Sequence, residues 1–179
     1  MPRPRRSEFP LTVSRAALLV DGSDEQCRRM IHDLVAYAHR LEACRDAFAA
    51  ILGMTGAQYE ILFVVARTKG LAVGEVASRL HRSGAFITIE ANKLVARGIL
   101  EKGSDPKDGR KVLLRPSIKC RALLERLAPY QRRINDVLFE RLDARRFRQL
   151  CDLAHELLRS GDRAVALLGY TLHEAKSAA

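Results

Sequence analysis

The chain has 179 residues, which suits one domain of ordinary size with or without terminal arms. Hydrophobic residues make up 47% of it, and 31 Lys and Arg stand against 21 Asp and Glu, for a formal net charge of +10. A positive charge of this size indicates a polyanionic partner and leaves DNA, RNA and an anionic membrane surface open. No apolar run approaches the roughly 20 residues needed to cross a bilayer, so we expect a cytoplasmic protein without a membrane partner.

Residues that carry enzyme or metal chemistry are sparse in this sequence. A Gly-rich phosphate loop, a Gly-x-Ser-x-Gly elbow and a His-Glu-x-x-His pair are all absent, and we expect neither an enzyme nor a cofactor. Cys151 and His155 lie four positions apart, which is half of a metal site, and a cysteine at this spacing more often packs in a core. The cysteines form no Cys-x-x-Cys pair, which in a reducing compartment argues against a disulfide scaffold and against a zinc ribbon: they are Cys27, Cys44, Cys120 and Cys151.

The first 22 residues predict an extended, basic N-terminal arm, because prolines resist helix formation there and arginines outnumber the acidic side chains. Three interpretations of the arm are open: it reaches along a nucleic acid, it wraps a partner subunit, or its first residues are disordered. We favour partner contact for residues 9–20, which contain many apolar side chains for a free tail: Phe9, Leu11, Val13, Leu18, Leu19 and Val20.

Helices follow the arm. Ser23 and Gln26 have the spacing of a capping box, which predicts the start of a long helix that ends at Gly53. Thr55 and Gln58 repeat this spacing and predict the start of a second helix.

The central part of the chain has the pattern of a helix-turn-helix followed by a wing. A short helix is expected over residues 73–80, and a further helix over residues 83–97 follows a tight turn. Two strands, over residues 99–102 and 111–115, enclose a turn-rich loop over residues 103–110. The fold class is therefore mainly α with a small β-hairpin wing.

Two long amphipathic helices are predicted after the wing, with Ser117 and Asp143 as their N-caps and Gly161 inside the second of them. The small central lobe cannot cover all of their apolar stripes, so we expect a homodimer. The predicted regions are an arm (1–22), a helical dimerisation region (23–54 and 117–170), a winged helix-turn-helix lobe (55–116) and a tail (171–179).

The central segment resembles the multiple antibiotic resistance regulator (MarR) family of winged helix-turn-helix transcription factors, and the resemblance covers about residues 24–169. The motifs that carry it are Thr55-Gly56-x-Gln58-Tyr59-x-Ile61-Leu62, Val73-x-Glu75-Val76-Ala77-x-x-Leu80, Leu94 with Gly98-Ile99-Leu100-Glu101, and Asp105-Pro106-x-Asp108-Gly109-Arg110. The wing motif is the most specific of these. The resemblance implies a homodimer that binds double-stranded DNA.

The predicted DNA-binding residues lie on the second helix of the motif and in the wing. On the helix, Ile87, Ala91 and Leu94 share one face that should pack inward. By resemblance, Asp108 positions Arg110 or braces the wing against the helix, while Arg110 enters a narrow minor groove. The complete predicted set is Ser83, Gly84, Ala85, Thr88, Asn92, Lys93, Lys107, Asp108, Arg110 and Lys111.

This helix departs from the common family pattern. Ala85, Phe86 and Ile89 occupy positions where Ser, Thr and Arg are frequent, so the helix has fewer polar side chains for base recognition. Apolar contacts with thymine methyl groups or the shape of the DNA would then contribute more of the discrimination.

The resemblance also implies an effector pocket between the dimer helices and the DNA-binding lobe, suited to an aromatic acid or an acyl-CoA-type ligand. The residues that we expect near it are His32, Tyr37, His39, Arg40 and Tyr59.

The function expected from the sequence is a homodimeric repressor on a pseudo-palindromic operator, with half-sites about 10 base pairs apart, that a small ligand releases. Two alternatives stay open: an oxidant-sensing repressor that uses Cys27, next to Arg28 and Arg29, or a non-specific basic nucleic-acid-binding protein.

Arg110→Ala tests the wing. We expect a strong loss of DNA affinity with an unchanged unfolding temperature, because the guanidinium is assigned to the minor groove and not to the core. Fluorescence anisotropy on labelled duplex DNA measures the loss, and an unchanged affinity would contradict the assignment of the wing.

Overall fold

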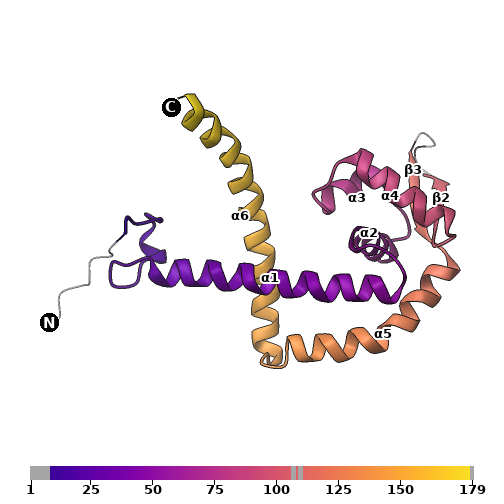
Figure 1. Cartoon of the computed structure of the whole chain (residues 1–179), viewed down its shortest axis with the longest axis horizontal. Coiled ribbons are helices and arrows are strands. Elements are labelled where there is room, and N and C mark those ends of the chain that lie inside the picture. Colours follow the sequence, from indigo (N-terminus) through magenta and orange to yellow (C-terminus); the bar gives the residue numbers. More distant parts are fainter. Residues whose placement is uncertain (1–8, 106–107, 109–110, 178–179) are drawn as a thin grey trace. The chain divides into compact units, whose positions relative to one another are not determined.

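The computed structural model describes residues 9–105, 108 and 111–177, and side chains as far as residue 172. The chain divides into two compact units, residues 1–132 and 133–179, each of which is described by itself. Figure 1 shows the elements in chain order: a 3-10 turn Ala16–Leu18, α1 Glu25–Ile51, α2 Gly56–Ala66, β1 Leu71–Ala72, α3 Val73–Arg79, α4 Gly84–Ala96, β2 Leu100–Ser104, β3 Val112–Pro116, α5 Ile118–Leu138 and α6 Ala144–Ser177.

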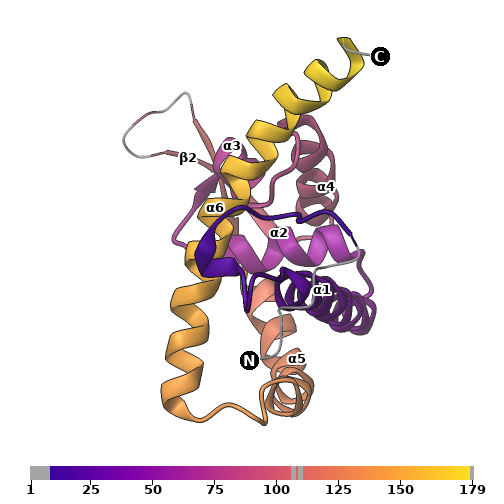
Figure 2. The same ribbon diagram turned by 90° about the vertical axis from the view of Figure 1, so that its left-hand side faces the viewer.

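The first unit is built around α2. This helix is apolar on nearly all sides, and Ile61, Leu62 and Val65 are completely buried. It packs against α1, α3, α4 and β3, and Figure 2 shows it between α1 and the α3–α4 pair. The first residues of α5 close the same core through Cys120 and Leu127.

A three-stranded antiparallel sheet with the order β1-β3-β2 forms the base of the wing. Leu114 of β3 lies opposite Leu71 on one side and Lys102 on the other. The two longer strands confirm the predicted hairpin. The sequence analysis missed β1, because two residues are too short to show an alternating pattern.

Three of the predicted helix caps, Thr55, Ser117 and Asp143, are confirmed, and Ser83 is a further cap that the sequence analysis did not name. The Gln58 N–H donates to Thr55 Oγ1 over 3.2 Å, and the Thr55 N–H donates back to Gln58 Oε1 over 3.3 Å. Ser83, Ser117 and Asp143 likewise accept the N–H three residues on, from Phe86, Cys120 and Arg146.

The capping box predicted at Ser23 and Gln26 is wrong. The helix α1 begins at Glu25 with Asp24 as its N-cap, and Ser23 Oγ accepts from the Glu25 N–H over 3.2 Å. Asp24 does not cap the helix with its side chain, because its carboxylate is bonded to Thr12.

The described part of the N-terminal arm is folded back on α1, so the prediction of an extended arm is wrong for residues 9–22. The backbone N–H and the hydroxyl of Thr12 both donate to Asp24 Oδ2, over 2.6 and 2.7 Å. The Arg28 guanidinium donates to the Pro10 carbonyl and pairs with the same carboxylate oxygen at 3.1 Å. Together these bonds lower the pKa of Asp24 to about 2. The two bonds from Thr12 contribute most to this lowering.

The second unit contains the long helix α6. It continues through Gly161 as predicted, and it extends to Ser177, into the segment that was expected to be a tail. None of the side chains described in α6, residues 144–172, is buried. A stripe of large apolar side chains is therefore open on this helix: Phe147, Leu150, Leu153, Leu157, Leu158, Val165, Leu168 and Leu172.

Among the described residues no single helix is both long enough and apolar enough to cross a membrane, and the one pair that meets the criterion together, α1 and α2, is bent by 87°.

Asp24→Asn tests the attachment of the arm. The pKa of Asp24 in the folded chain is about 2, below its ordinary 3.8, so the carboxylate holds the arm above pH 3.8 and releases it as the pH falls through about 2. At neutral pH we expect trypsin to cleave after Arg15 several-fold faster in this variant than in the wild type. Asp21→Asn is the control, because Asp21 is exposed in the same segment. Equal cleavage of the two variants would show that Asp24 does not hold the arm.

Candidate nucleic-acid interface

The helix α4 has one buried face and one open face. Ile87 and Leu94 are completely buried and Ala91 nearly so, which confirms the predicted packing face. The opposite face presents the predicted DNA-binding residues to solvent: Ser83, Gly84, Ala85, Thr88, Asn92 and Lys93 are all exposed.

The turn before α4 fixes where this helix starts. His81 has a φ of 50°, in the left-handed region, so the chain reverses within a few residues after α3. The Arg82 N–H then donates to the Ala77 carbonyl, and Ser83 caps α4. A Cβ added at Gly84 would meet nothing within 4 Å, so the N-terminal end of α4 is open to an approaching ligand.

Two of the predicted polar residues already have partners within the chain. The Thr88 hydroxyl donates to the Gly84 carbonyl over 2.8 Å, which leaves its lone pairs and its methyl group for other contacts. Lys93 Nζ donates to Glu90 Oε1 over 2.6 Å. Asn92 is thus the amide that is left exposed on this face.

A buried polar network holds α4 on α2, and the sequence analysis missed it. Gln58 Nε2 donates to Glu90 Oε2 over 2.9 Å, while Lys93 binds the other oxygen of this carboxylate. The Lys93 ammonium, with Gln58 second, keeps the pKa of Glu90 below its ordinary value. The signal was available, because Glu90 lies three residues after Ile87 on the buried stripe, where a charged side chain needs a partner.

The wing is described only in part. At its base the Asp105 N–H donates to the Lys111 carbonyl, and the Lys111 N–H donates to the Asp108 carbonyl, both over 2.9 Å. Asp108 Oδ2 lies 3.7 Å from Lys111 Nζ. Of the predicted wing residues, Lys107 and Arg110 lie outside the described residues.

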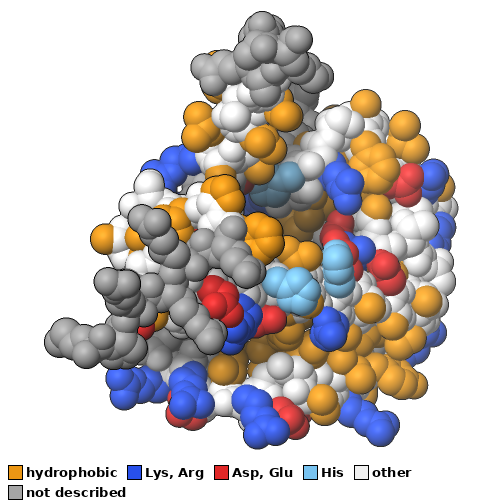
Figure 3. Space-filling view, turned by 60° about the vertical axis from the view of Figure 1, so that its left-hand side comes forward, with side chains coloured by type: hydrophobic (Ala, Val, Ile, Leu, Met, Phe, Trp, Pro, Cys, Tyr) orange, Lys and Arg blue, Asp and Glu red, His pale blue; other side chains and the backbone are white. Residues whose placement is uncertain are grey.

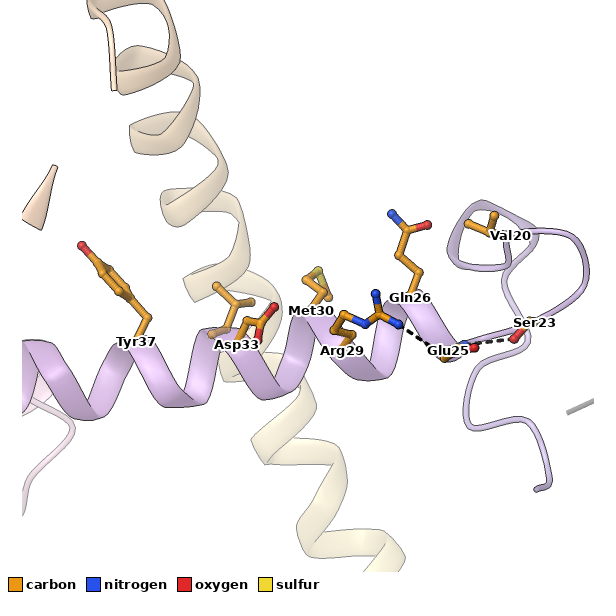
Figure 4. Close-up of a pocket in the computed structure, with 9 residues that line it drawn as sticks. Val20, Ser23, Glu25, Gln26, Arg29, Met30, Asp33 and Tyr37 are labelled. Carbon is orange, nitrogen blue, oxygen red and sulfur yellow. Dashed lines mark hydrogen bonds and ion pairs between the residues drawn. The ribbon is translucent and has the colours of Figure 1, made fainter. Parts of the chain in front are cut away.

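The predicted effector residues are not brought together within the described chain. Tyr37 lines a hollow of about 780 Å³ along α1, where Met30, Leu34 and Val20 supply apolar walls (Figure 4). His32, His39 and Arg40 are exposed on α1 and do not line this hollow.

Tyr59 belongs to the core. Its ring lies 5.9 Å from that of Phe63, and its phenol oxygen accepts a bond from Gln131 Nε2 over 2.7 Å. Burial raises the pKa of the Tyr59 phenol and also that of Tyr37.

The cysteine and metal alternatives receive little support. Cys27 is buried, and the neighbouring cations of Arg28 and Arg29 are paired with Asp24 and Glu25. In the part of the chain that the structure describes, no group of three or more His, Cys, Asp or Glu residues could hold a metal ion.

The order α2-β1-α3-α4-β2-β3, with a helix-turn-helix and a three-stranded wing base, defines a winged helix protein. Residues 52–111 match the family model described as the MarR family. The match lies in the winged helix lobe, and over these residues the chain is similar to the MarR family.

Solved structures of this fold resemble the chain. The PcaV transcriptional regulator from Streptomyces coelicolor, in complex with its natural ligand, is 27% identical, with a TM-score of 0.54 over 69% of this chain and 90% of that one. A mutant MarR from E. coli complexed with operator DNA is 21% identical, with a TM-score of 0.60 over 75% and 94%. BpsR from Bordetella bronchiseptica, whose DNA binding is regulated by 6-hydroxynicotinic acid, is 24% identical, with a TM-score of 0.58 over 70% and 90%. No curated protein matches the sequence.

A double-mutant cycle of Gln58→Ala and Glu90→Ala tests the network between α2 and α4. We expect the two residues to couple by about 1 kcal/mol or more in the free energy of unfolding, because a buried carboxylate loses a hydrogen bond. Urea denaturation of the four proteins measures the coupling, and additive effects would contradict a direct bond.

The same network makes the stability of the folded chain depend on pH. Because the pKa of Glu90 lies below its ordinary 4.5 in the folded chain, its contribution to stability is complete above pH 4.5 and declines as the pH falls further. The advantage of the wild type over Glu90→Gln should therefore shrink below pH 4.5.

Proposed function

We propose that this protein is a homodimeric repressor that binds a specific pseudo-palindromic site in double-stranded DNA and leaves it when a small aromatic acid or an acyl-CoA-type ligand binds. The observation that carries the proposal is the open face of α4, which projects small, polar and apolar side chains away from a fully packed core. The formal charge of +10 supports a polyanionic partner.

In this proposal α4 enters the major groove and the wing enters the adjacent minor groove. The capped start of α4 supports a phosphate contact, because its first N–H groups and the helix dipole favour an anion. Arg110 is assigned to the minor groove, and Lys107 and Lys111 to the phosphates beside it. The relative crystallised with operator DNA has the same fold and supports this arrangement.

Dimerisation is assigned to the apolar stripe of α6 together with exposed apolar residues of α1. Met30, Ile31, Leu34 and Val35 of α1 are each about half exposed, as are many side chains of α6. Figure 3 shows hydrophobic side chains at the surface between charged ones. Exposed stripes of this length mark a protein contact, because monomers rarely leave such large apolar patches in water.

The effector proposal rests on the hollow along α1 and on the relatives. Its lining combines apolar walls with Arg29 and the Tyr37 phenol, groups that suit an aromatic ring and a carboxylate. Arg29 is paired at 2.9 Å with Glu25 of the same helix, and both side chains are exposed to solvent. An acidic ligand would therefore compete with Glu25 for the Arg29 guanidinium. Two relatives of similar fold are described with a natural ligand and with 6-hydroxynicotinic acid.

Fluorescence anisotropy on duplex DNA from upstream of the protein's own gene tests the function. With excess competitor DNA at physiological salt, we expect saturable binding of one dimer per site, and an affinity that falls steeply with salt because several phosphates are neutralised. Aromatic acids and thioesters can then be screened for release. Equal affinity for the site and the competitor would favour the alternative of a non-specific nucleic-acid-binding protein.

Leu157→Glu gives the matched test of the dimer. A charge in the apolar stripe of α6 should weaken both dimerisation and operator binding by about tenfold or more. Ala166→Glu is the control, since it adds the same charge on the opposite face of α6. Sedimentation velocity measures the dimer, and equal behaviour of the two variants would contradict the assigned interface.

A further inference from the structure

The face of α4 that would approach DNA has an apolar centre. Ile89 is 56% exposed and stands between Ala85 and Asn92 on this face, while the core is already filled by Ile87 and Leu94 from the other side. Phe86, 37% exposed, lies at its margin. This branched apolar side chain does not belong to the hydrophobic core of its own lobe.

The polar side chains around Ile89 are partly committed to the protein itself. The Thr88 hydroxyl donates to Gly84, and Lys93 binds Glu90. The centre of this face therefore has few hydrogen-bond donors for the acceptor atoms of guanine, and apolar surface is its main feature.

Positive charges at the margin of this α4 face indicate that it binds a nucleic acid and not an apolar protein surface. The Arg82 guanidinium lies 5.9 Å from the centre of the Phe86 ring, on the side of the helix N-terminus, and Lys93 is half-exposed further along. Cations that flank an apolar centre match the major groove, whose floor carries base edges between two rows of phosphates.

We propose that α4 recognises thymine through its C5-methyl group, with Ile89 as the specificity-determining residue and Ala85 allowing close approach. In the major groove only thymine presents a methyl group, so an apolar side chain at the centre of a recognition helix selects A·T pairs at the positions it faces. RNA is excluded by the same chemistry, because uracil lacks this methyl group and the major groove of A-form RNA is too narrow for side chains. The inference rests on the proposed function, since it requires α4 to enter the groove.

The experiment removes single methyl groups from the DNA. Wild-type protein selects its preferred duplexes from a random-sequence library, and each thymine of the selected half-site is then replaced by uracil, one at a time. We expect one or two thymines near the centre of the half-site at which uracil lowers the wild-type affinity about fourfold, the value for one buried methyl group. Uracil in the flanking DNA should change nothing.

Ile89→Ala completes the test. This variant should bind the thymine duplex more weakly and bind thymine and uracil duplexes equally at those positions. Ile118→Ala is the control, since Ile118 is an isoleucine 85% exposed on another helix, and it should keep the wild-type sensitivity to uracil. Thermal unfolding checks that both variants fold.

Two results would overturn the inference. One is a wild-type protein that binds thymine and uracil duplexes equally at every position, and the other is an Ile89→Ala variant that keeps the wild-type sensitivity. Both leave specific DNA binding intact. A selection that enriches no sequence would instead overturn the proposed function itself, so the two failures are distinguishable.

Discussion

The burial of α2 is the constraint on which the rest of the DNA-binding lobe depends. With Ile61, Leu62 and Val65 out of water, α1, α3, α4 and β3 all pack on a single helix, and each of them is positioned by it. A helix this apolar has no stable place on a surface, so the surrounding elements can form only around it. The polar bond from Gln58 to Glu90 adds direction to this packing, because a hydrogen bond specifies an orientation that apolar contacts alone do not.

The positions of the regular elements could be largely predicted from local signals. Caps such as Thr55, Ser83, Ser117 and Asp143 satisfy backbone groups within three residues, so a short window of sequence contains both partners. The same holds for the buried face of α4, which follows from helical spacing alone. Long-range polar contacts have no such signature: nothing in the sequence near Thr12 indicates that it binds Asp24, and the fold of the arm was missed for this reason.

The exposure of the candidate interface residues on α4 could be predicted, whereas their hydrogen bonds within the chain were missed. The exposed residues on α4 were found from the helical period, but the internal bonds of Thr88 and Lys93 changed what they can offer to DNA. Both bonds join residues three or four apart, so they were available to sequence analysis. The positions of the residues predicted near an effector could not be found in this way, since Tyr37 lines a hollow that also includes residues of the arm, and Tyr59 lies in the core.

The side chain of Gln58 has a consequence for the chemical ageing of the protein. Its amide oxygen accepts from Thr55 and its amide nitrogen donates to Glu90, so both ends of one group are in use. A capping box accepts Gln or Glu equally, but here only the amide satisfies both partners. Deamidation would convert Gln58 to Glu. The capping bond with Thr55 at the start of α2 would remain, but the new carboxylate would face the carboxylate of Glu90 and repel it. Damage of this kind would weaken the contact between α2 and α4.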